Sequence, residues 1–270
     1  YFETMGTVSG VYMKYVALSA IGITSGISHL TDNWELTLQS SILFYVGACN
    51  GVIAVLFLLR KGMWLLGKNP ETGKLPLWSY ILWAGFHAPN TLYTYGHHHI
   101  LGKVLMMGAQ KEKTKDGKLV SKTVPSASEI YPGWWIGGKY ANDLGIKHWG
   151  GIIDLTVEFD ESCFDECAKG GYMNVPCWDG VPPTPAELDV AALHCARIKD
   201  PAKNPIIIHC AHGRGRSTTC MCAAFVKAGL HSTWESAFDA IKLKRPCVKL
   251  NSKMRKALTE WQAQYVDKAR

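Results

Sequence analysis

Residues 204–226 read NPIIIHCAHGRGRSTTCMCAAFV, an apolar run, a glycine-containing stretch and a second apolar run in direct succession. The β-branched run 204–209 is typical of a short buried strand. The small, apolar run 217–226 predicts a buried helix. Between them, Gly213 and Gly215 allow the chain to turn sharply. The sequence therefore predicts a strand, a tight loop and a helix, which is the repeating unit of an α/β fold.

The loop between this strand and this helix has the composition of an anion site. Its backbone N–H groups converge, and the helix N-terminus adds the positive end of the helix dipole. A thiol in such a place has a pKa of about 3.5–7.5 instead of about 8.5, so we expect Cys210 to be a thiolate nucleophile. The planar fork of Arg216 suits two phosphate oxygens. The hydroxyl of Ser217 is placed to assist the sulfur when it leaves.

Residues 209–217 resemble the H-C-x-x-G-x-x-R-S/T loop of cysteine-dependent phosphatases of the dual-specificity class, and every fixed position of that loop is filled. The resemblance covers roughly residues 128–268. It implies hydrolysis of phosphomonoesters in two steps through a phosphocysteine intermediate, and no cofactor or metal is expected. It also implies that the rest of the loop binds the phosphate, namely His209, Ala211, His212, Gly213, Arg214 and Gly215.

The implied mechanism needs a carboxylic acid that protonates the leaving oxygen and then activates water. In the class that the loop resembles, this acid is an aspartate on a loop upstream of the cysteine. Asp179 lies 31 residues before Cys210 (210 − 179), in the segment VPCWDGVPP, whose glycine and prolines suit a mobile lid. The rival carboxylates are Asp154 at a strand end, Asp160 and Asp165 in the acidic loop that follows, and Asp189 inside a predicted helix.

The order of these parts separates the chain from two other classes. Low-molecular-weight phosphatases have the cysteine loop near the chain start and the acid after it, and rhodanese-like domains have a shorter loop and no such acid. Further strands are predicted over 131–138, 150–156 and 172–177, with helices over about 184–199, 217–229, 233–243 and 252–265. This order predicts an α/β, dual-specificity phosphatase-like central sheet, partly parallel, with helices on both faces.

The first 100 residues differ in character from the rest. The segment 40–59 carries no charge over about 20 residues, the length of a bilayer core, so we interpret it as a transmembrane helix. The segment 15–30 predicts a second span, and 75–95 predicts either a third span or a helix in the headgroup layer. The expected organisation is a membrane region of two to three helices at 1–100, a basic linker at 101–127 and the cysteine-phosphatase domain at 128–270.

Charge and cysteine usage bear on topology and partners. The loop 31–39 has no Lys or Arg, whereas 60–74 has four, which places 60–74 on the cytoplasm-like face. The nine cysteines are scattered, which favours a reducing compartment, either cytosol-like or matrix-like, with the mitochondrion as one candidate organelle. A net charge of +7 agrees with anionic membrane lipids as a partner. No RNA-binding motif is present, so no nucleic-acid partner is expected.

Arg214, a second cation in the loop, gives a hint about the class of substrate. A basic residue at this place occurs in lipid-directed members of the class, including a mitochondrial phosphatase acting on phosphatidylglycerophosphate and the phosphoinositide phosphatases of the phosphatase and tensin homologue family. The spacing from Asp179 to Cys210 is similar to that of the mitochondrial enzyme. The expectation is a membrane-anchored phosphatase acting on a phospholipid headgroup. The alternatives are a protein tyrosine/serine/threonine phosphatase and a non-catalytic subunit of a membrane complex that retains the fold.

Overall fold

The chain divides into two units, each assembled from two pieces of sequence. The computed structural model describes residues 8–30, 34–101, 110–113, 119–122, 124–146, 148–163, 167 and 170–269. The first unit comprises Tyr1–Gly67 and Leu75–Tyr93, and the second comprises Lys68–Lys74 and Thr94–Arg270. The short segment Lys68–Lys74 thus belongs to the second unit, although the sequence on both sides of it belongs to the first.

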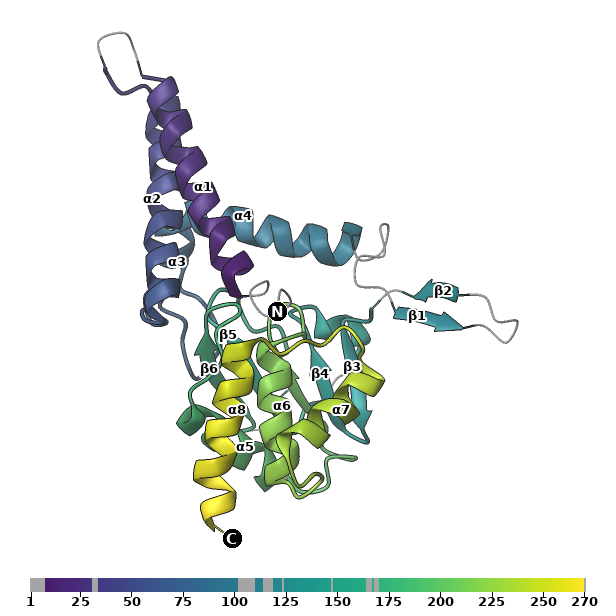
Figure 1. Cartoon of the computed structure of the whole chain (residues 1–270). Helices are drawn as coiled ribbons and strands as arrows, with labels where there is room; N and C mark the ends of the chain where they lie inside the picture. Colours follow the sequence, from purple (N-terminus) through teal and green to yellow (C-terminus); the bar gives the residue numbers. More distant parts are fainter. Residues whose placement is uncertain are drawn as a thin grey trace. The chain divides into compact units, whose positions relative to one another are not determined.

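Two long helices that pack side by side, α1 (Val8–Ser28) and α2 (Leu38–Leu59), dominate the first unit (Figure 1). A Cβ atom on Gly22 would lie 2.8 Å from the backbone of Gly47, so glycine at these positions lets the two backbones approach closely. By length and composition alone, α2 is the one helix among those described that could cross a bilayer.

The segment 75–95 is divided between two shorter helices, α3 (Leu77–Leu82) and α4 (Ala84–Tyr95). Neither α3 nor α4 by itself reaches the roughly 20 residues that a bilayer core requires, although a π-helix (Gly96–Leu101) directly follows α4. A third span or a helix in the headgroup layer therefore both stay predictions. The buried Asn50 in the middle of α2 donates to the carbonyl of Gly85 in α4 over 2.8 Å. The polar group inside the apolar helix therefore serves a helix–helix contact.

A five-stranded mixed sheet forms the centre of the second unit. Its strands are β3 (Ala127–Tyr131), β4 (Trp134–Gly137), β5 (Gly151–Thr156), β6 (Tyr172–Cys177) and β7 (Ile206–His209). They lie in the order β3-β4-β7-β5-β6, with β3 antiparallel to β4 and all other pairs parallel. The carboxyl ends of β4, β5, β6 and β7 therefore share one edge of the sheet, where ligands of such sheets bind. A separate hairpin, β1 (Gln110–Lys113) and β2 (Leu119–Lys122), lies within the predicted basic linker.

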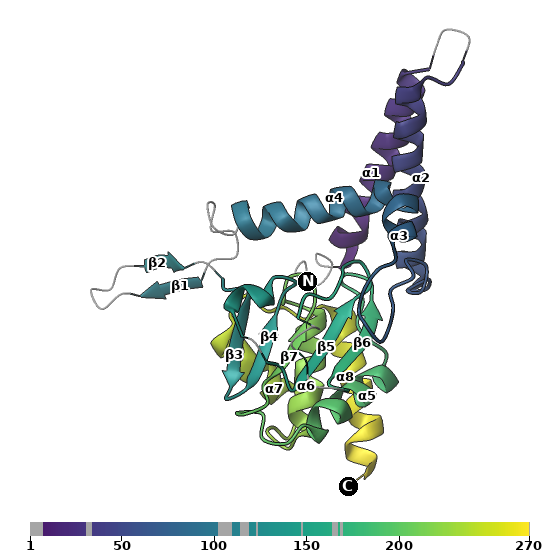
Figure 2. The ribbon, with the colours of Figure 1, turned by 180° about the vertical axis from the view of Figure 1, so that it is seen from behind.

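Four helices cover one face of this sheet: α5 (Pro185–Arg197), α6 (Arg216–Lys227), α7 (Trp234–Lys244) and α8 (Ser252–Tyr265) (Figures 1 and 2). They share a core with Ile153, Ile206 and Ile208. The other face has a smaller cluster around Trp149 and Ile207, to which strands, loops and a 3-10 helix (Ala141–Leu144) contribute. The predicted class, a sheet flanked by helices after a helical region, is confirmed. Helices were expected on both faces, but among the described residues the α-helices cover one face, and the described part of the connection from β4 to β5 contains a 3-10 helix instead.

Candidate active site

The predicted strand, loop and helix are present, with β7 ending at His209, the loop at 210–215 and α6 beginning at Arg216. Gly213 has a φ of +65°, a conformation that side chains other than glycine rarely adopt. A Cβ atom there would also lie 2.5 Å from the carbonyl carbon of Gly137 on β4. Glycine at this position therefore lets the loop turn tightly over the end of the neighbouring strand.

Three carbonyl groups of the loop are held by donors from other segments. Lys139 N donates to Ala211 O over 3.1 Å, Arg245 Nε to Gly213 O over 2.9 Å, and Lys249 N to Arg214 O over 3.0 Å. In a trans peptide the next N–H points away from the preceding carbonyl, so these bonds turn N–H groups toward the opposite side of the loop. Within the described part of the chain, the N–H groups of residues 213–215 meet no acceptor. The loop thus offers unpaired donors to an anion.

Cys210 is buried at the start of this loop, and its Sγ lies 3.4 Å from Oγ of Ser217. Burial acts to raise its pKa, but the Arg216 guanidinium and hydrogen bonds from Ser217 outweigh burial, so the pKa of Cys210 is lowered. The buried thiols of Cys195 and Cys220 lack these partners: burial raises the pKa of Cys195 to about 12 and that of Cys220 well above its usual value. Unlike these two thiols, Cys210 is therefore favoured as a thiolate.

Arg216 is buried and fixed from several sides. Its Nη2 lies 2.8 Å from Oε1 of Glu158 and its Nη1 lies 3.2 Å from Oε2, while Nη1 also donates to the carbonyls of Leu155 and Cys177 over 3.1 and 2.6 Å. Although burial opposes it, the Glu158 carboxylate holds the pKa of Arg216 well above its usual value. Its Nε has no acceptor among the described residues. A fixed guanidinium with a spare donor is suited to bind a phosphate oxygen.

Asp179, the predicted acid, follows β6 at the edge where the loop lies. Its Oδ1 is 3.2 Å from Nη2 of Arg216, and its side chain is 26% exposed. The structure therefore brings together four of the predicted residues, Cys210, Arg216, Ser217 and Asp179. A phosphate bound to Arg216 would compete with Asp179 for the guanidinium and release its carboxyl group toward the bound ester.

The rival carboxylates are placed differently. Asp154 is buried in an ion pair with Lys68, and although burial raises its pKa, Lys68 and His209 outweigh burial and lower it. An acid that stays ionised has no proton to donate. Asp189 is on α5, 2.7 Å from Nζ of Lys227. Asp160 is half-buried in the loop after β5, and Asp165 lies outside the described residues.

The sequence reasoning missed two glutamates in the acidic loop after β5, where only Asp160 and Asp165 were considered. Glu158 holds Arg216, and Oε2 of Glu161 lies 2.5 Å from Nε2 of His209. Burial alone would lower the pKa of His209, but Glu161 raises it to about 9. A signal for both was present, since an arginine and a histidine buried at one sheet edge require carboxylates nearby.

A cleft opens beside the phosphate loop, on the side of β4. Its lining includes Lys139, Tyr140, His212 and Arg214. The pKa of Lys139 is lowered by burial, against the opposing effect of Asp160, and its Nζ lies 4.2 Å from the ring centroid of Phe159. Within the described residues, neither Lys139 nor Arg214 forms an ion pair. Two cations that form no ion pair with a described residue thus lie along a cleft next to the loop.

Comparisons with known proteins gave matches among solved structures only. No family model matches the chain, and no curated protein is significantly similar to it in sequence. The structure of human DUSP28 is 17% identical to this chain in sequence; the match covers 52% of this chain and 94% of DUSP28, with a TM-score of 0.42. The structure of PTPMT1 in complex with PI(5)P is 18% identical; the match covers 54% of this chain and 100% of PTPMT1, with a TM-score of 0.44. Tk-PTP in the active form is 22% identical; the match covers 52% of this chain and 98% of Tk-PTP, with a TM-score of 0.43. At these identities and TM-scores, the similarity does not establish the reaction, which has to be inferred from the site.

Proposed function

We propose that this chain is a cysteine-dependent phosphatase of the dual-specificity type, which hydrolyses phosphomonoesters at the 210–216 loop. The observation that carries this proposal is the pairing of Cys210, whose pKa is lowered, with the buried Arg216, whose Nε has no acceptor among the described residues. Backbone N–H groups of residues 213–215, which meet no acceptor among the described residues, lie in the same loop. A nucleophile and phosphate donors at one loop suit transfer of a phosphoryl group to sulfur.

The reaction follows from this geometry in two balanced steps. The Cys210 thiolate attacks phosphorus, an S–P bond forms, and the P–O bond to the leaving group breaks as Asp179 gives that oxygen a proton. Water then attacks phosphorus, the Asp179 carboxylate takes one of its protons, and the S–P bond breaks. The hydroxyl of Ser217, 3.4 Å from the sulfur, stabilises the departing thiolate. The products are an alcohol and inorganic phosphate.

We infer that the substrate is a phospholipid headgroup presented at a membrane. The long apolar helix α2 supports a membrane anchor, with the catalytic unit on a reducing face where Cys210 stays a thiol. The cations Lys139 and Arg214 in the adjoining cleft support a substrate with a second anionic group, such as phosphatidylglycerophosphate or a phosphoinositide. An anchor also raises the effective concentration of lipid at the site.

The test is turnover by the full chain in detergent micelles, with Cys210→Ser as the control. Hydrolysis of para-nitrophenyl phosphate that the substitution abolishes supports the phosphatase, and no such turnover leaves a non-catalytic membrane subunit as the better interpretation. Phosphate release from phosphatidylglycerophosphate and phosphoinositides is then compared with release from phosphotyrosine and phosphoserine peptides. Faster turnover of peptides would assign the enzyme to protein substrates instead.

A further inference from the structure

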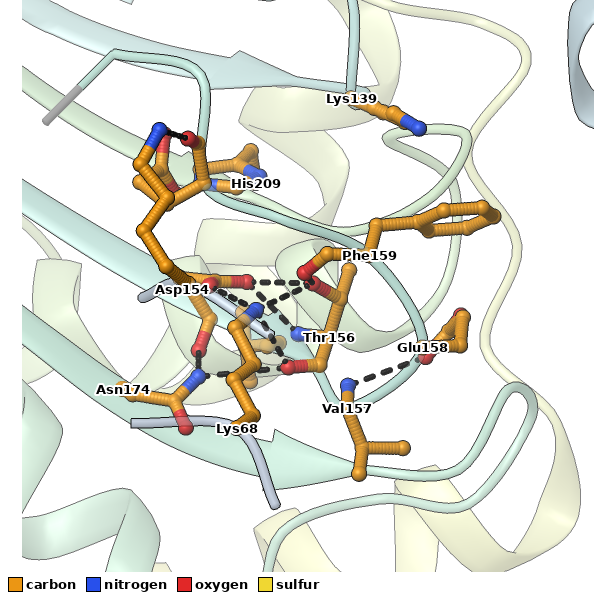
Figure 3. Close-up of polar contacts among 12 residues, drawn as sticks. Lys68, Lys139, Asp154, Thr156, Val157, Glu158, Phe159, Asn174 and His209 are labelled. Atoms are coloured by element: carbon orange, nitrogen blue, oxygen red, sulfur yellow. Dashed lines mark hydrogen bonds and ion pairs between the residues drawn. The ribbon is translucent and has the colours of Figure 1, made fainter. Parts of the chain in front are cut away.

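A cluster of four buried charges includes His209, the residue directly before the phosphate loop; three of its members, Lys68, Asp154 and His209, are labelled in Figure 3. The side chains of Lys68, Asp154, Glu161 and His209 are each at most 5% exposed. Ligand atoms of the two carboxylates and the imidazole all lie within 4.8 Å of one another. His209 precedes Cys210 directly, and its raised pKa keeps it protonated at neutral pH. Two cations thus balance two anions in a place where an unbalanced charge is costly.

Lys68 reaches this cluster from a segment distant in sequence, Lys68–Lys74, which lies between α2 and α3 along the chain. Its Nζ pairs with Asp154 and donates to the carbonyl and the hydroxyl of Thr156, each over 2.9 Å (Figure 3). Two of its three hydrogen bonds therefore go to the residue at which β5 ends. A lysine this deeply buried is rare unless it is paired, and Asp154 is its partner here.

The same segment contacts the loop after β5 at a second point. The N–H of Glu161 donates to the carbonyl of Gly73 over 2.9 Å, and Nζ of Lys74 donates to the carbonyl of Glu161 over 2.9 Å. A Cβ atom on Gly73, whose φ is +65°, would lie 2.5 Å from Cβ of Glu161. The close approach needs glycine here, so the segment is fitted to the loop and holds it at both ends, at residues 156 and 161.

The loop 156–161 in turn holds both ends of the phosphate loop. Glu158 forms an ion pair with Arg216, at the end of the phosphate loop, and Glu161 pairs with His209, the residue directly before Cys210. A continuous series of polar contacts therefore runs from Lys68 through the loop 156–161 to the two residues that flank the phosphate site. Each contact in this series lies within the second unit.

We propose that Lys68 is a positioning residue for the phosphatase reaction, which fixes the loop 156–161 so that Glu158 and Glu161 hold Arg216 and His209 in place. This inference rests on the proposed function. It makes the catalytic centre dependent on a segment encoded between two apolar helices, so the catalytic unit is not a contiguous C-terminal piece of the sequence.

The experiment compares the full chain with Lys68→Met in detergent micelles. We expect kcat for para-nitrophenyl phosphate to fall between about 10- and 100-fold, the size of effect that a small displacement of catalytic groups produces. The pH profile of Cys210 alkylation by iodoacetamide is a second readout and needs no turnover. Charges facing Cys210 are Arg216, Arg245 and Asp179. Because a displaced Arg216 stabilises the thiolate less, the profile is expected to move to higher pH.

Two further variants separate positioning from folding. Lys203→Met removes an exposed lysine and should leave both readouts unchanged. The double variant Lys68→Met/Asp154→Asn removes one charge of each sign, so its thermal stability should recover relative to Lys68→Met. It should keep the low kcat and the shifted alkylation profile, because Thr156 still lacks the hydrogen-bond donor that Lys68 supplies. Wild-type kcat and a wild-type alkylation profile in the double variant would overturn the proposal. If the wild type hydrolyses no phosphomonoester, the proposed function fails, while the alkylation profiles still decide the positioning role.

Discussion

Glu158 grips Arg216 with both carboxylate oxygens, Oε1 2.8 Å from Nη2 and Oε2 3.2 Å from Nη1, and both side chains are almost fully buried. The arrangement leaves the Nε edge of the guanidinium without an acceptor among the described residues. One side of the arginine thus pairs with Glu158, while its Nε keeps a donor that the proposed phosphate could use. The pair is a requirement for both the stability and the proposed chemistry of the site.

Glu158→Gln should therefore impair stability and catalysis together. Removing one partner of a buried ion pair costs about 3–5 kcal/mol, because the other charge stays buried without compensation. Displacement of Arg216 should also lower kcat/KM for para-nitrophenyl phosphate by roughly 100-fold. Thermal melting and steady-state kinetics of the full chain measure the two effects. Glu260→Gln on α8, whose partner Lys256 is exposed, is the matched control, and equal effects in the two variants would contradict the assigned role.

Asp179→Asn tests the acid by the dependence of the rate on the leaving group. An aryl phosphate with a basic leaving oxygen needs the proton, whereas para-nitrophenolate leaves without much help. The loss of kcat should be between about 100- and 10,000-fold for phenyl phosphate and clearly smaller for para-nitrophenyl phosphate. Rates for a series of aryl phosphates plotted against leaving-group pKa give the answer. An equal loss across the series would assign the acid to another carboxylate, and Asp160→Asn is then the next variant.

The pair of His209 and Glu161 predicts a pH dependence of stability. The pKa of His209 is raised in the folded chain from 6.5 to about 9, chiefly by Glu161 against the effect of burial, so between these values the folded state binds more protons than the unfolded state. The stabilisation is complete below pH 6.5 and is lost as the pH rises toward 9. Melting temperatures should decline over this window, and Glu161→Gln should flatten the decline while lowering stability at acidic pH. An unchanged slope in that variant would contradict the assignment.

The residues in and near the phosphate loop could be predicted from the sequence, whereas contacts between distant segments could not. Gly213, Cys210 and Arg216 follow from local rules of turns, anion sites and strand–loop–helix order. Asp179 follows from the position of the acid that the resemblance to the dual-specificity class implies. Lys68 was beyond such reasoning, because its partner Asp154 lies 86 residues away and only the folded sheet brings them together. The prediction of helices on both faces was wrong for a similar reason. The face that a connecting helix covers depends on the order of the strands in the sheet, which local sequence does not reveal.

Lys139 and Arg214 should matter for an anionic lipid more than for a small aryl phosphate. Each cation near an anionic lipid surface contributes about 1 kcal/mol, so replacing both with Gln should lower kcat/KM on vesicles containing phosphatidylglycerophosphate by roughly 30-fold. The loss for para-nitrophenyl phosphate should be much smaller, and added salt should narrow the difference because it screens exposed charges. The matched control replaces two exposed lysines of α7, Lys242 and Lys244, with Gln. An equal loss in that control would show that general attraction to the membrane, rather than the cleft beside the loop, accounts for the effect.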